Sequence, residues 1–314
     1  MRWDAELGWL IAGVLGVLVV ATIAGQILKR RARSDNARAT VDNINARIAG
    51  WWVMCAVFAV ALLTAGVGSI VLFGLMSFFA LREFITLTAT KRGDHWTLFW
   101  SFFLVLPVQY YFVADEWYGM FSIFIPVYVF LFLPISVALA GDTERFLQRT
   151  ATVQWGLMIT VYLVSHAPAM LVMLDIPGYE DQNGKLLVYF VLITQASDVL
   201  QYIFGKLLGR HRIAPNISPD KTWEGFIGGV AAAVLLGTLL WWATPFNPWQ
   251  SALMSLAITV MGFFGGLTMS AIKRDRGVKD YGSMIPGHGG MLDRIDSLCF
   301  AAPVFFHLTR YYFG

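Results

Sequence analysis

Long apolar runs separated by short polar segments extend along the whole chain. In a lipid bilayer each backbone polar group must be hydrogen-bonded within its own element, and a helix needs roughly 20 apolar residues to cross a hydrocarbon layer of about 30 Å. Runs of about this length lie near residues 7–28, 48–65, 67–88, 95–113, 118–140, 151–174, 186–207, 225–244, 250–272 and 296–313. We therefore expect an all-α, polytopic integral membrane protein with about ten transmembrane helices. Only Gly66 and Gly68 separate the second run from the third.

The polar connections between these runs alternate in charge. Short cytoplasmic loops carry an excess of Lys and Arg, whereas loops on the opposite side do not. The basic connections hold Lys29, Arg30, Arg31, Arg33, Arg38 and Arg47; Arg82, Lys91 and Arg92; Arg145 and Arg149; Lys206, Arg210, Arg212 and Lys221; and the segment 273–294. The connections between them hold acids or no charge. This alternation predicts that both termini lie on the non-cytoplasmic side and that residues 206–221 and 270–296 share the cytoplasmic face.

The first apolar run and the basic segment after it form a distinct N-terminal region. The run is preceded by acids, followed by bases, and longer than the roughly 7 to 15 apolar residues of a signal peptide, so we expect a retained membrane helix. The basic segment from Lys29 to Arg47 predicts a solvated loop or a surface helix near anionic headgroups. We divide the chain into this region (1–47), a helical scaffold (48–184) and a catalytic region (185–314).

Composition supports the membrane assignment and excludes several other classes. The chain is 57% hydrophobic and 14% charged, far from the roughly 25% charged residues of soluble domains. Its net charge of +3 is too small to indicate a nucleic-acid partner. Cys55 and Cys299 each lie within an apolar run, which predicts small core side chains rather than a disulfide or a cysteine zinc site.

Residues 270–296 concentrate the polar chemistry between two apolar runs. Asp280, Asp293 and Asp296 are hard oxygen ligands, and one or two carboxylates together with substrate phosphates are the usual ligands of Mg²⁺ in nucleotide chemistry. If the last helix begins near Asp293, the three-residue spacing places Asp293 and Asp296 on one face. The bases Lys273, Arg274, Arg276, Lys279 and Arg294 supply the opposing charge.

The same segment contains a turn suited to an anion. Pro286, Gly287, Gly289 and Gly290 allow the backbone to approach a phosphate closely, and His288 can donate a hydrogen bond to it. The alternative is a basic cytoplasmic loop of the ordinary kind. Topology requires bases, however, and it requires neither the acids nor the His-Gly-Gly turn.

Two further features point to the same face. Ser218 followed by Pro219 predicts a helix N-cap with proline at the first helical position, where free N–H groups and Lys221 would meet a phosphate. Asp198 lies within an apolar run, where an acid is costly and indicates function by default. A structural alternative for Asp198 is a hydrogen bond to a neighbouring helix.

These patterns resemble those of a known family. The spacing S-x-x-K-R-x4-K-D-x5-P-x-H-G-G-x2-D-R-x-D over residues 270–296 resembles the signature of the phosphatidate cytidylyltransferases (CDP-diacylglycerol synthases). Residues 218–225 resemble that family's S-P-x-K-T-W-E-G motif. The resemblance extends from about residue 185 to the end, with Gln201 standing where the family usually has a small residue.

The resemblance implies a membrane enzyme that condenses CTP with phosphatidate to give CDP-diacylglycerol and pyrophosphate. It also implies Mg²⁺, with a second cation possible, and a homodimer, on the cytoplasmic face of a bacterial inner membrane. The expected catalytic residues are Lys273, Lys279, Asp280, His288 and Arg294; the substrate-binding residues are Ser218, Lys221, Thr222, Ser270, Arg274, Gly289 and Gly290; and the metal ligands are Asp280, Asp293, Asp296 and Asp198.

Two other functions stay open at this point. A CTP-dependent prenol or lipid kinase would let an alcohol attack the γ-phosphorus, and an ion-coupled transporter would use Asp198 in an ion path. Among the other polar residues, we interpret His166 as an interhelical contact. Arg82 with Glu83 is interpreted as a helix end at the interface, and Asp142 with Glu144 as a solvated loop.

Overall fold

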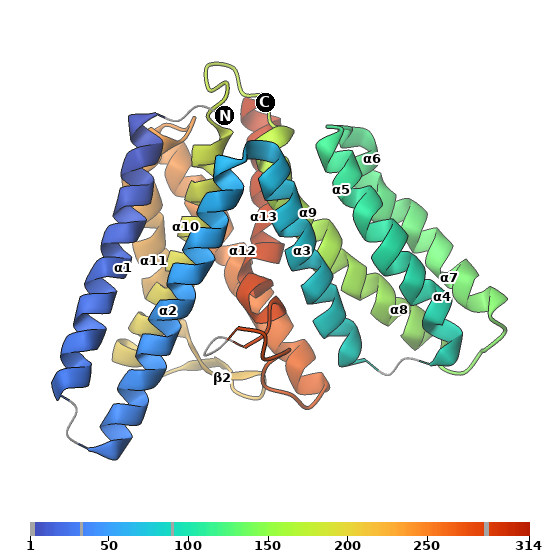
Figure 1. Cartoon of the computed structure of the whole chain (residues 1–314), viewed down its shortest axis with the longest axis horizontal. Helices are drawn as coiled ribbons and strands as arrows, with labels where there is room; N and C mark the ends of the chain where they lie inside the picture. The colour runs from blue at the N-terminus through green and yellow to red at the C-terminus, as the bar shows by residue number, and fades with distance from the viewer. Residues whose placement is uncertain (1–3, 32–33, 89–90, 286–288) are drawn as a thin grey trace.

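The computed structural model describes residues 4–31, 34–88, 91–285 and 289–314. Within these residues the chain is helical apart from one two-stranded sheet, and the helices form ten rods in chain order, one for each predicted run. The rods lie side by side, with the two termini near one end and the sheet at the other (Figure 1). The all-α prediction is therefore confirmed.

Seven rods are single helices and three contain a π-helical segment. The single helices are α1 (Ala5–Arg31), α2 (Asp35–Leu63), α3 (Ala65–Thr86), α10 (Asn183–Leu208), α11 (Trp223–Leu239), α12 (Pro248–Asp275) and α13 (Leu292–Phe313). The composite rods are α4 (His95–Trp100), η2 (Ser101–Val105) and α5 (Leu106–Ala114); α6 (Tyr118–Ile123), η3 (Phe124–Val129) and α7 (Phe130–Leu139); and α8 (Phe146–Leu157), η4 (Met158–Tyr162) and α9 (Leu163–Val172). Short 3-10 turns lie at η1 (Arg92–Asp94) and η5 (Trp241–Ala243).

Local sequence explains where several helices begin. The side chain of Asn247 accepts a hydrogen bond from the backbone N–H of Gln250 at 2.9 Å, and the side-chain oxygen of Gln250 accepts one from the backbone N–H of Asn247 at 2.9 Å. This capping box, with Pro248 at the first position, starts α12. Helices α2 and α3 meet at Thr64, and Ala65 adopts a left-handed φ of 55°. The predicted break between the second and third apolar runs is thus confirmed.

Eight of the ten rods are long and apolar enough to cross a membrane, within the part of the chain that the structure describes. The two exceptions are α11 and α13. Helix α11 has 17 residues, and α13 carries Asp293, Arg294 and Asp296 in its first two turns. Both helices contribute residues to the polar cleft described in the next subsection. The charged residues at the start of α13 face this cleft rather than lipid.

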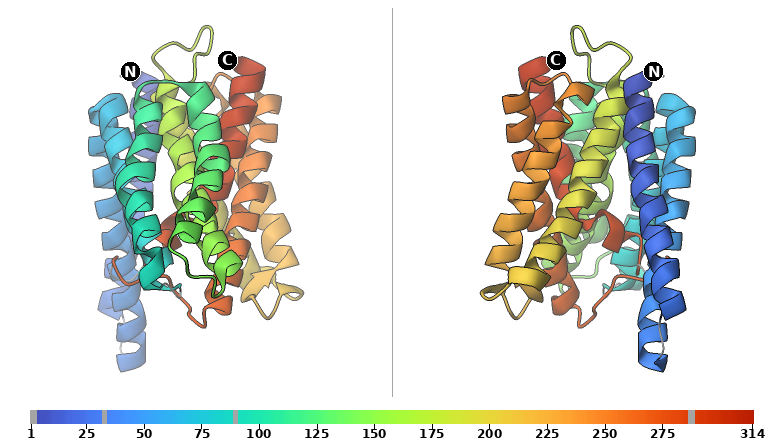
Figure 2. Two further views of the ribbon diagram at one scale, coloured as in Figure 1. Left: turned by 90° about the vertical axis from the view of Figure 1, so that its right-hand side faces the viewer. Right: turned by 90° about the vertical axis from the view of Figure 1, so that its left-hand side faces the viewer.

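The basic segment after the first helix is more ordered than predicted. Helix α2 begins at Asp35, where the side chain of Ser34 accepts a hydrogen bond from the N–H of Ala37 at 3.2 Å, and it continues without a break through Arg47. Residues 35–47 contain neither Gly nor Pro, so nothing in the sequence ends the helix before its apolar half. The lower ends of α1 and α2 project beyond the other helices (Figure 2).

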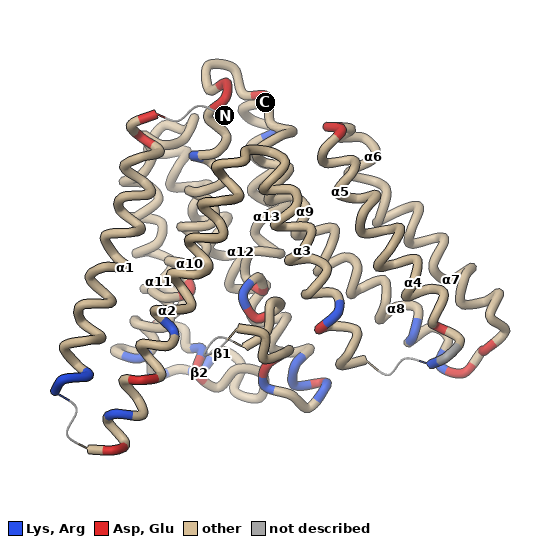
Figure 3. Tube along the Cα trace, in the orientation of Figure 1, with Lys and Arg blue, Asp and Glu red and all other residues tan. Residues whose placement is uncertain are grey.

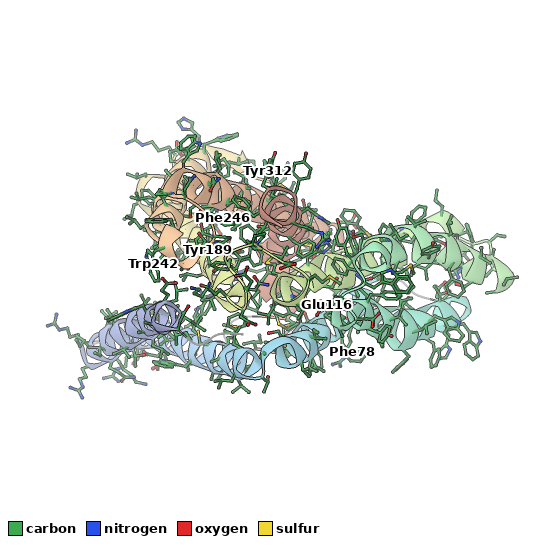
Figure 4. All side chains as sticks on the ribbon, turned by 90° about the horizontal axis from the view of Figure 1, so that it is seen from above. Phe78, Glu116, Tyr189, Trp242, Phe246 and Tyr312 are labelled. Atoms are coloured by element: carbon green, nitrogen blue, oxygen red, sulfur yellow. The ribbon has the colours of Figure 1, made fainter. Side chains whose placement is uncertain are left out.

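The rods form three groups. Helices α1, α2 and α3 lie in a row along one edge, α10 to α13 pack together behind it, and the composite rods extend to the other side (Figure 4). Stacked rings of Phe190 and Phe305, 5.5 Å apart, lie in the core, and His166 is fully buried against Phe121 and Phe306. His166 is therefore a packing contact between helices, as predicted.

Charge is distributed unevenly along the rods. Most Lys and Arg residues gather at the end that holds the sheet, whereas both termini lie near the opposite end (Figure 3). This separation agrees with the alternation read from the sequence. The assignment of the basic end to the cytoplasm stays a prediction from the positive-inside rule.

Candidate active site

A cleft of about 840 Å³ lies at the basic end, between α10, the sheet, α12 and α13. Most of the predicted site residues line it: Asp198, Ser218, Lys221, Thr222, Ser270, Lys279, Asp280, Gly289, Asp293, Arg294 and Asp296. Segments separated by nearly 100 residues in the sequence therefore converge on one polar space. His288, Pro286 and Gly287 lie outside the described residues.

The predicted helix start at Ser218 is wrong. Residues Ser218–Thr222 form strand β2, which pairs antiparallel with β1 (Arg212–Ala214). The helix cap is Thr222, whose hydroxyl accepts a hydrogen bond from the N–H of Gly225 at 3.1 Å, and α11 begins at Trp223. An extended β-branched residue that ends a strand can also cap the next helix, so the start moves four residues downstream of Ser218.

Strand β2 carries Lys221 into the cleft. Its ammonium lies 3.4 Å from the carbonyl oxygen of Phe263 and 4.6 Å from the centre of that ring. Burial lowers the pKa of Lys221, and the carboxylates of Asp198 and Asp296 act in the opposite direction. Within the described residues Lys221 makes no ion pair at 4.0 Å or less, so its charge is available to an anionic ligand.

Two carboxylates on adjacent helices flank Ser297. The hydroxyl of Ser297 donates to Asp198 Oδ1 at 3.0 Å, and its backbone N–H donates to Asp296 Oδ1 at 2.9 Å. Both acids line the cleft. In the residues that the structure describes, no group of three or more His, Cys, Asp or Glu side chains could hold a metal by itself. A pair of carboxylates fits Mg²⁺ when phosphates and water complete the shell.

Asp293 is the centre of a separate hydrogen-bond network. Lys273 Nζ donates to its Oδ1 at 2.9 Å, and the N–H groups of Tyr281 and Gly290 donate to its Oδ2 at 2.8 and 3.0 Å. Gly289 has φ 84°, and a Cβ there would lie 2.9 Å from Oδ2. In this structure Lys273 and Gly290 thus contact Asp293, and neither lines the cleft.

The remaining predicted residues lie around these networks. Arg274 donates from Nε to the carbonyl of Ile217 at 3.2 Å and from Nη1 to that of Val278 at 3.0 Å, which ties the end of α12 to the segment before β2. Lys279 and Asp280 are exposed on the loop that follows α12. Arg274 does not line the cleft.

Several residues of the site were missed by the sequence reasoning. Arg47 and Trp51 of α2 line the cleft, and only the packing of α2 against the bundle brings them there. Gln195 and Gln201 lie about one turn from Asp198 on α10, so their polarity within an apolar run was the available signal. Gln201 donates to Ser197 Oγ at 2.7 Å. Glu83 of α3 binds the backbone at the start of α13.

An apolar cavity of about 630 Å³ adjoins the cleft between α2, α3, α10 and α13. The two spaces share Trp51, Gln195, Ile285 and Arg294 in their walls. The rest of the cavity is lined mainly by apolar side chains, among them Met54, Phe58, Phe73 and Leu298. Arg294 Nε is buried and has no hydrogen-bond partner among the described residues. Arg294 therefore lies where the polar and apolar spaces meet, with its Nε free of hydrogen bonds to the described part of the chain.

Comparison with known proteins agrees with this geometry. The sequence profile of the cytidylyltransferase family matches residues 45–312. An uncharacterized protein of Escherichia coli K12, YnbB, is 39% identical over 306 residues, which cover 96% of this chain and 97% of that protein.

Two enzymes match the sequence of this chain over a shorter length. The phosphatidate cytidylyltransferase of Synechocystis is 47% identical over 116 residues, covering 36% of this chain and 39% of the enzyme. That of Staphylococcus haemolyticus is 41% identical over 120 residues, covering 38% and 46%. The chain thus matches less than half the length of each enzyme.

Proposed function

This chain belongs to the cytidylyltransferase family, and we propose that it transfers the cytidylyl group of CTP to phosphatidate, forming CDP-diacylglycerol and releasing pyrophosphate. The observation that carries the proposal is the meeting of a polar cleft with an apolar cavity at Arg294. A reaction between a nucleotide and a lipid phosphate requires both kinds of space to open onto one point. Family membership makes the chain a nucleotidyltransferase, and the proposal adds the substrates.

In the proposed reaction an oxygen of the lipid phosphomonoester attacks the α-phosphorus of CTP in line. A bond forms between that oxygen and the α-phosphorus, and the bond from the α-phosphorus to the oxygen bridging the β-phosphorus breaks, so pyrophosphate leaves. The reaction needs no covalent protein intermediate. Catalysis is then a matter of positioning two anions and neutralising their charge.

The cleft residues divide into two roles for the nucleotide. Lys221, Ser218 and Ser270 bind its phosphates, with Lys279 on the exposed loop as a further cation. Asp198 and Asp296 would hold Mg²⁺, which when bound neutralises phosphate charge and orients the leaving group. Asp280 and Asp293 stay predicted ligands, and Asp293 would have to exchange a present hydrogen bond for the metal.

The apolar cavity suits the lipid. Acyl chains would pack against Met54, Phe58 and Phe73, while Arg294 binds the phosphate at the junction. A guanidinium offers paired N–H groups that match a phosphate bidentately. The attacking oxygen would then face the cleft, where the carboxylate pair lies.

Product analysis tests the proposed function. The purified protein is incubated with Mg²⁺, phosphatidate and CTP labelled at the α-phosphorus, and the label is followed between the aqueous and lipid phases. We expect the label in the lipid, stoichiometric pyrophosphate, and loss of transfer when EDTA removes the metal. A parallel run supplies a prenol in place of phosphatidate. A newly phosphorylated prenol with the label in CDP would instead establish a kinase, and no turnover in either run would overturn the proposal.

A further inference from the structure

Glu83 of α3 reaches across the bundle to the start of α13. Its Oε1 accepts a hydrogen bond from the N–H of Met291 at 2.9 Å, and its Oε2 accepts one from the N–H of Leu292 at 2.8 Å, across 208 and 209 residues of sequence. N–H groups in the first turn of a helix have no partner within the helix. Glu83 therefore caps α13 from a different helix, a role that the sequence assigns to no neighbouring residue.

Two glycines that precede α13, Gly282 and Gly290, lie close to this carboxylate. A Cβ at Gly282 would lie 2.7 Å from Glu83 Oε1, and a Cβ at Gly290 would overlap the same carboxylate. Glu83 forms no ion pair with a Lys or Arg in the described part of the chain. Its charge is instead stabilised by backbone N–H groups and by the positive end of the α13 dipole.

These contacts change the interpretation of the glycine turn. The sequence suggested that the backbone at Gly289 and Gly290 approaches a substrate phosphate. In the structure the N–H of Gly290 donates to Asp293, and the next two N–H groups donate to Glu83. Two carboxylates of the protein thus occupy the anion-binding end of α13. Lys221, which forms no ion pair with any residue that the structure describes, lies on the strand that forms another wall of the cleft.

We propose that Glu83 is a positioning residue for cytidylyl transfer. The first two turns of α13 carry Arg294 and Asp296 into the cleft, and Glu83 fixes those turns against α3. Helix α3 also supplies Phe73 to the wall of the apolar cavity. The same helix therefore lines the space proposed for the lipid and holds the start of α13. A displacement of about 1 Å in such a group can lower a rate by about 100-fold.

The test compares Glu83→Gln with Glu180→Gln. Glu180 is a matched control because its carboxylate also accepts a backbone hydrogen bond, from the N–H of Gly178 at 2.8 Å, in a loop remote from the cleft. The amide of Glu83→Gln keeps the size of the side chain but turns a donor toward the N–H groups of α13. We expect kcat for cytidylyl transfer to fall about 10- to 100-fold with KM for CTP within about twofold, and no change in the control.

Two outcomes would overturn the inference. Equal kcat values for Glu83→Gln and the control would remove the positioning role. A changed KM for CTP with unchanged kcat would show that the turn binds nucleotide phosphate. Gly290→Ala, which pushes a methyl group against the same carboxylate, provides a second variant with the same expected loss if Glu83→Gln does not fold.

The readout through kcat rests on the proposed function, so hydrogen exchange supplies an independent one. The amide of Glu83→Gln keeps one acceptor oxygen and replaces the other with a donor, so one of the two backbone amides, Met291 or Leu292, loses its partner. We therefore expect faster deuterium uptake at the start of α13 in Glu83→Gln than in Glu180→Gln. Unchanged uptake would overturn the inference even if the wild type proved to act on other substrates. A wild type without turnover but with faster uptake in the variant would refute only the proposed function.

Discussion

Lys221 shows how a single residue sets a pH dependence. Burial lowers its pKa below the ordinary lysine value of about 10.4, because the low-dielectric cleft disfavours the ammonium. The folded protein holds this proton less tightly than the unfolded chain does. The destabilising contribution of Lys221 is therefore present below the folded pKa and is relieved as pH rises toward the unfolded value.

A rise in pH should weaken nucleotide binding, although it relieves the destabilising contribution of Lys221 to folding. Because the proposed function has this ammonium bind phosphate, we expect KM for CTP to rise with pH at values below the ordinary lysine range. Lys221→Arg keeps its charge throughout that range, so its KM should stay flat where that of the wild type rises. Measurement of KM from about pH 7 to about pH 10 checks this, and the same rise in both proteins would contradict it.

The residues differ in how far the sequence could predict them. Asp198 lies within an apolar run, so the cost of placing an acid there indicated a function, whereas Lys221 was predicted from its place beside the Ser218-Pro219 pair. Glu83 gave no such signal, because its partners are backbone N–H groups more than 200 residues away. Asp293 was predicted in the right place, but its contacts with Lys273 and Tyr281 depend on the path of a loop.

Among the elements, helix α2 contributes more to the site than the sequence indicated. Its apolar half was predicted as a span, but Arg47 lies one turn before Trp51, and both side chains line the cleft. Apolar periodicity predicts that a helix exists and leaves its rotation against its neighbours undetermined. Strand β2 shows that a local pattern can also predict the wrong element. Its Ser-Pro pair is typical of a helix start, but it lies in an extended segment that ends at Thr222.

The position of Arg47 leads to a prediction for α2. Arg47 is an exposed cation at the edge of the cleft, so it should attract the lipid phosphate by no more than about 1 kcal/mol. We expect Arg47→Gln to raise KM for phosphatidate about three- to fivefold without changing KM for CTP. Arg38→Gln on the same helix is the control, since Arg38 does not line the cleft. Equal effects of the two substitutions would indicate a general surface charge effect instead.

For the whole molecule, the N-terminal helix is joined to the catalytic region by a buried cation. Lys185 of α10 is 1% exposed and donates to Asp4 Oδ2 at 2.9 Å, to the carboxylate of Glu6, and to Gln182 Oε1 at 2.6 Å. The family match begins at residue 45, so α1 lies outside it, whereas YnbB shares almost the full length. The catalytic region predicted at 185–314 thus receives contacts from α1, α2 and α3.

This junction predicts a loss of stability. Lys185→Met leaves two carboxylates facing a buried apolar group; breaking a fully buried pair costs about 3–5 kcal/mol, and the partial exposure of Asp4 and Glu6 reduces this to about 1–3 kcal/mol. We expect the melting temperature in detergent to fall by several degrees relative to Lys206→Met, which removes an exposed lysine from the same helix. Equal melting temperatures would show that α1 is held by its apolar contacts alone.

The central claim is that nucleotide and lipid meet at the junction of the cleft and the cavity, with Lys221 on the nucleotide side and Arg294 on the lipid side. The most direct measurement is KM for each substrate in Lys221→Gln and in Arg294→Gln. The account predicts a crossed pattern, in which Lys221→Gln raises KM for CTP about tenfold, Arg294→Gln raises KM for phosphatidate about tenfold, and each leaves the other KM within about twofold. Both substitutions raising KM for the same substrate would contradict it.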